Sequence, residues 1–248
     1  MTEPRELTEL FRAARRVVND APHVRAPLFA VAAIGGAEVQ DLLAHVGPSH
    51  LMPDDLLVGV QSVISFFLPF KPEVLAAARK DAPQVSRTWA EAYTTGNRAV
   101  DEVGLAVAEA LLAQGHRVTV RPATGDFQPE TLTGEWSHKS VAAFAGLGTF
   151  GRNQQIVTRA GCAGRLGTLL TTAVLPVHSP GLPRSCDALC GEEAPCRAAC
   201  PIGAFAGVDG AFDRAACYAR LRESAERFGD LPDAEVCGIC ALARCARL

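Results

Sequence analysis

The chain has 248 residues, a formal net charge of −3 with charges of both signs dispersed, and 48% hydrophobic residues. This length suits one large domain or two smaller ones, and the apolar content is enough for a packed core. Strong non-specific nucleic-acid binding is not expected because no dense basic run is present, and a membrane span is not expected because no run of 18 apolar residues occurs.

The first predicted element is an amphipathic helix over residues 3–19, where apolar residues recur at helical spacing. This charged N-terminal stretch lacks the apolar core of a signal peptide. We therefore expect a cytoplasmic protein. In that compartment, nine cysteines indicate metal binding rather than disulfides.

Predicted strands and helices then alternate along the chain. In order they are strand 28–34, helix 37–46, strand 58–68, helix 86–114, strand 118–121, a loop at 123–136, helix 137–145, and strands near 155–158 and 168–175. Such alternation predicts an α/β fold, a mixed sandwich domain over residues 1–180. Prolines and a glycine between Pro176 and Pro183 mark its end. The remainder, residues 181–248, is cysteine-rich and too poor in core residues to be stable without metal.

Eight of the nine cysteines lie in the last 63 residues. They are Cys186, Cys190, Cys196, Cys200, Cys217, Cys237, Cys240 and Cys245. Eight thiolates are enough for two 4Fe–4S clusters, and the Cys-x3-Cys-Pro sequence at Cys196–Pro201 matches the end of the bacterial ferredoxin run. We interpret residues 181–248 as a small, bacterial ferredoxin-like domain with two such clusters. A zinc site at Cys237-x2-Cys240 is the alternative.

The ferredoxin pattern also predicts how the ligands divide, because its fourth cysteine crosses to the other cluster. One cluster is then held by Cys186, Cys190, Cys196 and Cys245, and the other by Cys200, Cys217, Cys237 and Cys240. The intervals of three and five residues in the first group are longer than the usual two. Cys162 lies outside the group and is expected to be a buried free thiol.

A second motif gives the cysteine-rich region a context. The stretch Ser137-His-Lys-Ser140, the block Ala145-Gly-Leu-Gly-Thr-Phe-Gly-Arg-Asn153 and the segment Thr171–Pro176, joined to the cysteine pattern, resemble the epoxyqueuosine reductase family over about residues 85–248. The resemblance implies a nitroreductase-like α/β domain that carries cobalamin, with two 4Fe–4S clusters that feed electrons to the cobalt. Reductive dehalogenases share this design.

The same resemblance implies that the glycine-rich block lies against the corrinoid, where glycines permit close backbone approach. The residues expected to bind the cofactor are His138, Lys139, Gly146, Leu147, Gly148, Gly151, Arg152 and Asn153. A glycine-rich turn without a ligand is the alternative.

No motif in the sequence identifies the proton donor. The family carries a catalytic aspartate about a dozen residues before the glycine-rich block, and Leu132 stands at that place here. A reduction that adds electrons usually also needs protons. Asp126, Glu135 and His138 are therefore the candidate catalytic residues, with Glu130 nearby; solvated loop charges are the alternative interpretation.

We expect an iron–sulfur oxidoreductase that passes electrons through two clusters to a bound cobalamin and reduces an unidentified substrate, with a ferredoxin or flavodoxin as electron donor. The tRNA-modifying members of the family add C-terminal helical repeats, whereas this sequence ends at Leu248. We therefore expect a small molecule or a corrinoid protein, rather than tRNA, as substrate. The alternatives are an electron-transfer or corrinoid-activating protein without its own small-molecule substrate, and a flavin-binding variant.

Overall fold

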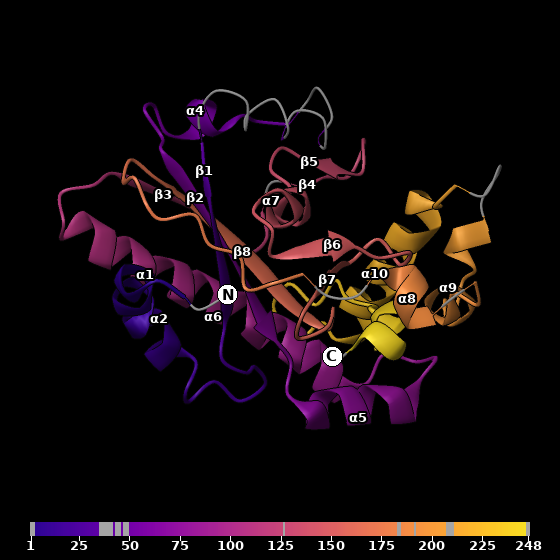
Figure 1. The fold of residues 1–248 in the computed structure, drawn as a ribbon. Coiled ribbons are helices and arrows are strands. Elements are labelled where there is room, and N and C mark those ends of the chain that lie inside the picture. The colour runs from indigo at the N-terminus through magenta and orange to yellow at the C-terminus, as the bar shows by residue number, and fades with distance from the viewer. Residues whose placement is uncertain are drawn as a thin grey trace.

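In the computed structural model, a four-stranded antiparallel sheet runs through the centre of the molecule (Figure 1). Its strands, in spatial order, are β1 (Leu28–Ala33), β2 (Ser62–Pro69), β8 (Gly164–Thr171) and β3 (Val118–Arg121). The structure describes residues 3–34, 42, 46, 50–125, 127–182, 185–190, 192–206 and 211–246.

Helices and short hairpins surround this sheet. The helices before and beside it are α1 (Arg5–Leu10), α2 (Arg12–Val17), α4 (Pro53–Leu56), α5 (Pro72–Asp81), α6 (Arg87–Leu112) and α7 (His138–Phe144). Two hairpins pair β4 (Phe127–Gln128) with β5 (Thr133–Gly134), and β6 (Gly148–Phe150) with β7 (Ile156–Thr158). The cysteine-rich part holds α8 (Cys186–Cys190), α9 (Pro195–Ala198), α10 (Arg214–Arg227) and three 3-10 turns, η1 (Ala204–Ala206), η3 (Ile239–Leu242) and η4 (Arg244–Ala246). None of the described helices combines the length and apolarity that a membrane span requires.

Strand β2 is buried at all of its eight positions because both faces of the sheet are covered. Its alternate residues Ile64, Phe66 and Leu68 join the core formed with α1, α2, α5 and α6. Val63 and Phe67 point to the opposite face, where α7 and the glycine-rich block pack. The α/β fold with a buried central strand is thus confirmed.

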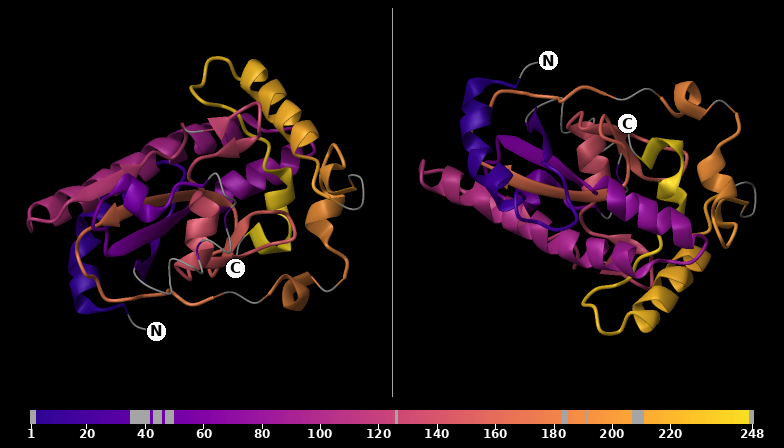
Figure 2. Two further views of the ribbon diagram at one scale, coloured as in Figure 1. Left: turned by 90° about the horizontal axis from the view of Figure 1, so that it is seen from above. Right: turned by 90° about the horizontal axis from the view of Figure 1, so that it is seen from below.

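The long helix α6 agrees closely with the predicted helix over residues 86–114. Ser86 caps it, since its side chain accepts a hydrogen bond from Trp89 N at 3.1 Å. The apolar face of α6 packs across β8 and β3. Trp89 lies on this face near the start of the helix, which brings it to the end of the sheet where the cysteine-rich part lies (Figures 1 and 2).

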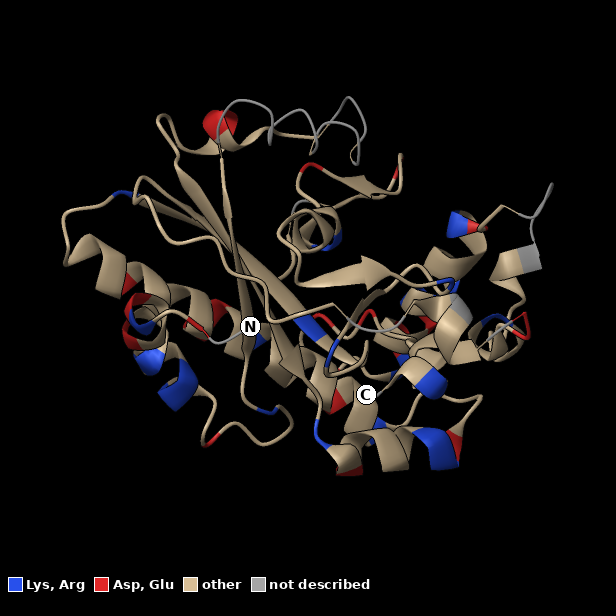
Figure 3. Ribbon diagram, in the orientation of Figure 1, with Lys and Arg blue, Asp and Glu red and all other residues tan. Residues whose placement is uncertain are grey.

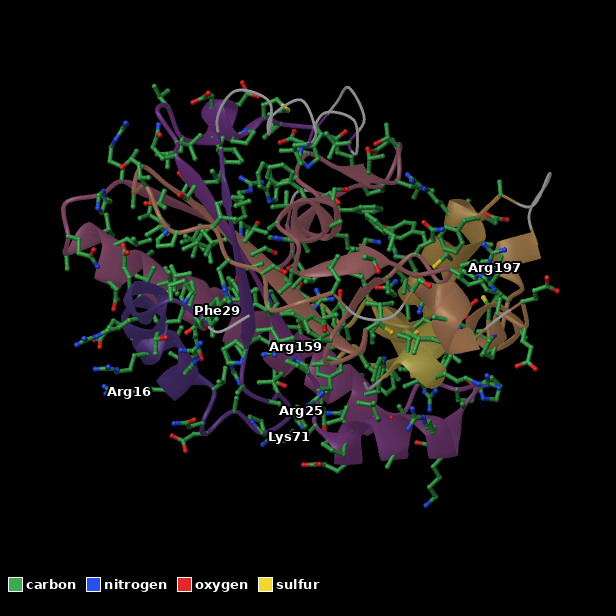
Figure 4. The ribbon with its side chains drawn as sticks, in the orientation of Figure 1. Arg16, Arg25, Phe29, Lys71, Arg159 and Arg197 are labelled. Carbon is green, nitrogen blue, oxygen red and sulfur yellow. The ribbon has the colours of Figure 1, made fainter. Side chains whose placement is uncertain are left out.

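Several local predictions differ from the structure. The strand predicted over residues 58–68 begins only at Ser62, as β2, and the strand predicted to 175 ends at Thr171. The helix predicted over residues 3–19 is interrupted at Phe11, whose ring stacks on Phe29 of β1 with centroids 3.9 Å apart; Figure 4 shows Phe29 beside these helices. The predicted loop 123–136 contains the β4–β5 hairpin. Strand β8 begins at Gly164, ahead of the predicted start at 168. The predicted helix 37–46 lies almost wholly outside the described residues.

The cysteine-rich part contributes to the main core. Its apolar side chains Phe228, Val236, Ile239 and Leu242 pack in the same buried cluster as Trp89. Both views in Figure 2 show α10 beside the start of α6. At the same end, Arg87 of α6 forms two hydrogen bonds, of 2.7 and 2.9 Å, with the carboxylate of Asp230. The cysteines are therefore positioned by contacts with the sheet domain as well as by their own helices.

Candidate functional site

The first group of cysteines gathers where α8, α9 and η4 meet. Its members are Cys186, Cys190, Cys196 and Cys245. Burial raises the pKa of the Cys190 thiol, and the neighbouring charges of Cys245 and Cys186 raise it further. Burial raises the pKa of Cys196 in the same way, again reinforced by Cys245 and Cys186. These four sulfur atoms therefore lie near enough to interact electrostatically, although 59 residues separate Cys186 from Cys245.

A second group adjoins the first. Its members are Cys200, Cys217, Cys237 and Cys240. Burial raises the pKa of the Cys240 thiol to about 12, with further contributions from the other three members and from Cys196 of the first group. Burial likewise raises the pKa of Cys217, which also responds to Cys237 and Cys200. The Sγ atom of Cys200 accepts a hydrogen bond from Ala204 N at 3.4 Å.

All nine cysteines are free thiols. Among the described histidine, cysteine and acidic side chains, no three converge closely enough to bind one metal ion together. In a 4Fe–4S cluster each of the four thiolates ligates a different iron atom. The ligands of a cluster therefore stand farther apart than the ligands of a single ion.

Asn153, at the end of the glycine-rich block, joins this block to the segment that carries Cys240. It is 1% exposed. Its Nδ2 donates to the carbonyl oxygen of Cys240 at 3.2 Å and approaches the Sγ of Cys162 at 3.7 Å, while its Oδ1 accepts from Gln155 N at 3.2 Å. Both polar atoms of this buried amide are thus engaged, and the bond to Cys240 O holds the glycine-rich block against the cysteine-rich part.

A pocket of about 910 Å³ opens between the sheet domain and α10. It is lined by residues from five stretches of the chain, among them Tyr93, Trp136, Lys139, Cys162, Arg165 and Tyr218. The rings of Phe127 and Tyr218 lie 5.1 Å apart, so the β4–β5 hairpin and α10 meet at the pocket. This volume lies at the upper end of the range for ligand sites in proteins, which run from about 300 to 1,000 Å³.

One wall of the pocket is fixed by a hydrogen-bond network around Thr168, which is fully buried. Trp136 Nε1 donates to Thr168 Oγ1 at 2.7 Å, and Thr168 Oγ1 lies 2.8 Å from His138 Nδ1. His138 Nε2 lies 2.9 Å from the carbonyl oxygen of Pro122, which can only accept. His138 Nε2 therefore carries a proton, and both ring nitrogens are engaged within the protein.

The lining of the pocket also carries positive charge. Arg165 stacks over the ring of Tyr93, 4.2 Å from its centroid, and donates to Asn97 Oδ1 at 2.6 Å. Lys139 Nζ donates to the carbonyl oxygen of Gln154 at 3.1 Å. Burial lowers the pKa of Lys139, and the charge of Arg214 lowers it further. The charges of Cys217 and Cys240 act in the opposite direction, and Tyr218, which follows Cys217 in the chain, lines the pocket.

The predicted cofactor-binding residues fall in three places. His138 and Lys139 line the large pocket. Gly151 and Arg152 line a smaller pocket of about 440 Å³ that also includes Cys186. The other predicted residues, which line neither pocket, are Gly146, Leu147, Gly148 and Asn153. Packing explains two of them: Leu147 is fully buried, and a Cβ on Gly148 would stand 2.5 Å from Val157 O. Whether any of them contacts a cofactor stays a prediction.

Of the predicted catalytic residues, His138 lines the large pocket. Glu135 is exposed, and its Oε1 accepts a hydrogen bond from Gln128 Nε2 at 3.4 Å. Asp126 lies outside the described residues. Leu132 occupies the hairpin turn with a left-handed φ of 54°. The pocket residues that the sequence did not identify, Tyr93, Arg165 and Tyr218, come from segments far apart in the chain and carry no local motif.

Comparison with known proteins gives structural matches only. No protein-family model matches the chain, and no curated protein matches it in sequence. A selenomethionine-labelled epoxyqueuosine reductase covers 81% of the chain at 19% identity with a TM-score of 0.52, and the enzyme from Streptococcus thermophilus covers 96% at 14% identity with a TM-score of 0.55. An epoxyqueuosine reductase with a modified tRNA-Tyr stem loop covers 81% at 22% identity with a TM-score of 0.50.

The chain spans about half the length of two of these structures, 53% and 52%, and 65% of the Streptococcus thermophilus enzyme. The matches extend over the sheet domain and beyond it, since they cover at least 81% of the chain. The protein therefore has the fold of the epoxyqueuosine reductases.

Proposed function

We propose that this protein is an iron–sulfur oxidoreductase of the epoxyqueuosine reductase-like type, in which two 4Fe–4S clusters supply electrons to a corrinoid in the large pocket. The observation that supports the proposal is that these eight cysteines, far apart in the sequence, lie near enough to alter one another's pKa values, which agrees with the predicted division into two groups of four. The fold supports it independently.

The cysteines fit the clusters in number, grouping and environment. Each group has four thiols, the number that a 4Fe–4S cluster requires. The backbone N–H of Ala204 at the Cys200 sulfur is the kind of donor that stabilises a ligating thiolate.

The pocket fits a large cofactor. It offers about 910 Å³, aromatic side chains from α6 and α10, and the cations Lys139 and Arg165 for the polar periphery of a ligand. A bound corrinoid would supply a cobalt centre that accepts single electrons. Glu135 does not line the pocket, whereas Lys139 and Tyr93 do. His138 also lines the pocket, but both of its ring nitrogens are engaged within the protein. We therefore assign the delivery of protons to Lys139 and Tyr93.

The test is the cofactor content of protein purified without oxygen: iron, sulfide, cobalt and flavin measured together, followed by titration with cobalamin. We expect close to eight iron atoms and eight sulfides per chain. Zinc without sulfide would contradict the clusters. A protein that contains flavin and does not bind cobalamin would contradict the corrinoid and support the flavin-binding alternative.

A pair of α10 variants ties cobalamin binding to the pocket. Ala225 lines it, whereas Ala215 lies exposed on the same helix outside it. We expect A225W to fill the pocket and abolish cobalamin binding, and A215W to bind as the wild type does. Equal binding by both variants would place the corrinoid elsewhere.

A further inference from the structure

Cys162, the ninth cysteine, lies against one of the eight proposed cluster ligands. It is 5% exposed, and its Sγ stands 3.6 Å from the Sγ of Cys245. Its backbone N–H donates to the carbonyl oxygen of Cys245 at 2.8 Å, and the next residue, Ala163, donates to Ala246 O at 3.3 Å. Both the main chain and the side chain of Cys162 therefore hold the segment that carries Cys245.

The surroundings define the direction of the hydrogen bond between the two sulfur atoms. Asn153 Nδ2 approaches Cys162 Sγ at 3.7 Å and can only donate, so the sulfur of Cys162 accepts there. The orientation of this amide follows from its other bonds, since Nδ2 also donates to Cys240 O and Oδ1 accepts from Gln155 N. The thiol hydrogen of Cys162 is therefore available to donate to another acceptor.

Two acceptors stand within reach of that hydrogen: the Sγ of Cys245 at 3.6 Å and the carbonyl oxygen of Ala241, also at 3.6 Å. A ligating cysteine is a thiolate. A negatively charged acceptor forms the stronger hydrogen bond of the two. The S–H of Cys162 is therefore directed to Cys245 once Cys245 ligates iron.

We propose that Cys162 is a positioning residue of the cluster that Cys245 ligates, and that its S–H donates to the Cys245 thiolate and raises the reduction potential of that cluster. The inference rests on the proposed function, because it needs the cluster. Hydrogen bonds to cluster sulfurs stabilise the more negative, reduced state and so shift its potential upward. Between two adjoining clusters, this bond shifts the distribution of a transferred electron toward the cluster that Cys245 ligates.

The experiment is a redox titration followed by electron paramagnetic resonance, on anaerobically purified wild type, C162A and C162S. We expect C162A to disfavour reduction of one cluster about tenfold, the effect of one weak hydrogen bond to a charged group, which is about 59 mV for a one-electron couple. The second cluster keeps its potential. C162S retains a donor at the same place, so the reduction potential of its cluster should stay nearer to that of the wild type.

Cofactor analysis separates the two proposals. Wild-type protein without iron and sulfide would overturn the proposed function and this inference with it. C162A with full iron and sulfide and unchanged potentials would overturn the inference alone. C162V removes the donor while filling the volume. If neither C162A nor C162V holds the cluster, Cys162 is required for assembly and the tuning role is wrong.

Discussion

Gly238 lies directly against the indole ring of Trp89: a Cβ at position 238 would stand 2.8 Å from Cζ2 of that ring. Gly238 also has a φ of +65°, in the left-handed region that favours glycine. Trp89 is buried at the start of α6, and Gly238 stands between Cys237 and Cys240. This contact packs the segment that carries Cys237 and Cys240, two of the proposed cluster ligands, against the main core.

The first prediction concerns this contact. We expect G238A to lower the free energy of unfolding by about 2–5 kcal/mol, because left-handed strain and a clash with the indole ring add together. We also expect it to lose iron from one cluster. Urea unfolding and iron analysis measure the two effects.

Gly203 is the matched control, with a φ of +63° and open space where a Cβ would be. G203A should lose only the strain energy, about 1–2 kcal/mol. Equal losses in G203A and G238A would show that the contact with Trp89 has no energetic role.

The second prediction concerns the amide of Asn153. In N153L the carbonyl of Cys240 loses its donor within the buried interface. We expect a loss of about 1–3 kcal/mol, the cost of a buried polar group without its partner. Urea unfolding gives the value, and Q114A, which alters an exposed amide, serves as control. A loss no larger than that of Q114A would contradict the joining role of Asn153.

The third prediction concerns the pocket wall. T168V removes the oxygen that accepts from Trp136 and contacts His138. We expect it to lose about 1–3 kcal/mol of stability, whereas T168S keeps the hydroxyl and loses about 1 kcal/mol for one buried methyl group. The emission spectrum of Trp136 should shift in T168V and not in T168S. A shared shift would assign the effect to the methyl group.

The elements that the sequence predicted well are those with a strong local signal. Helix α6 has a long apolar stripe with a serine cap, and strand β2 is rich in β-branched and aromatic residues. The start of β8 was missed because Gly164 and Gly167 weaken a strand when read alone. In the fold these glycines are needed, since a Cβ on Gly167 would stand 2.3 Å from the ring of Phe66.

The candidate site shows the same contrast between residues with a local sequence signal and residues without one. The proposed ligands could be named from spacing, because a cluster imposes a sequence pattern on its cysteines. The pocket could not, since Tyr93 and Tyr218 are 125 residues apart and meet through packing alone. The hydrogen-bonded state of His138 likewise depends on Thr168, a sheet residue with no motif.

The fourth prediction concerns pH. His178 is 4% exposed, and its Nδ1 has no hydrogen-bond partner among the described residues. Burial lowers its pKa below the ordinary 6.5, although the charge of Glu3 acts in the opposite direction. The unfolded chain therefore binds this proton more readily than the folded protein does, so folding stability is present above 6.5 and is lost as the pH falls below it.

Urea unfolding of wild type and H178Q on either side of pH 6.5 tests this expectation. The wild type should lose more free energy of unfolding on acidification than H178Q does. Because the other histidines are common to both proteins, the difference isolates His178. Parallel pH profiles would show that His178 does not titrate differently on folding.

The backbone bonds from Cys162 and Ala163 to residues 245 and 246 can form only after residues 245 and 246 have been synthesised. The sheet, α5 and α6 leave the ribosome long before the segment that covers Trp89. A nascent chain must therefore keep that apolar end of the sheet exposed until residues 236–246 have been translated. Chaperone dependence of the newly made chain should end when residues 236–246 emerge, and not before.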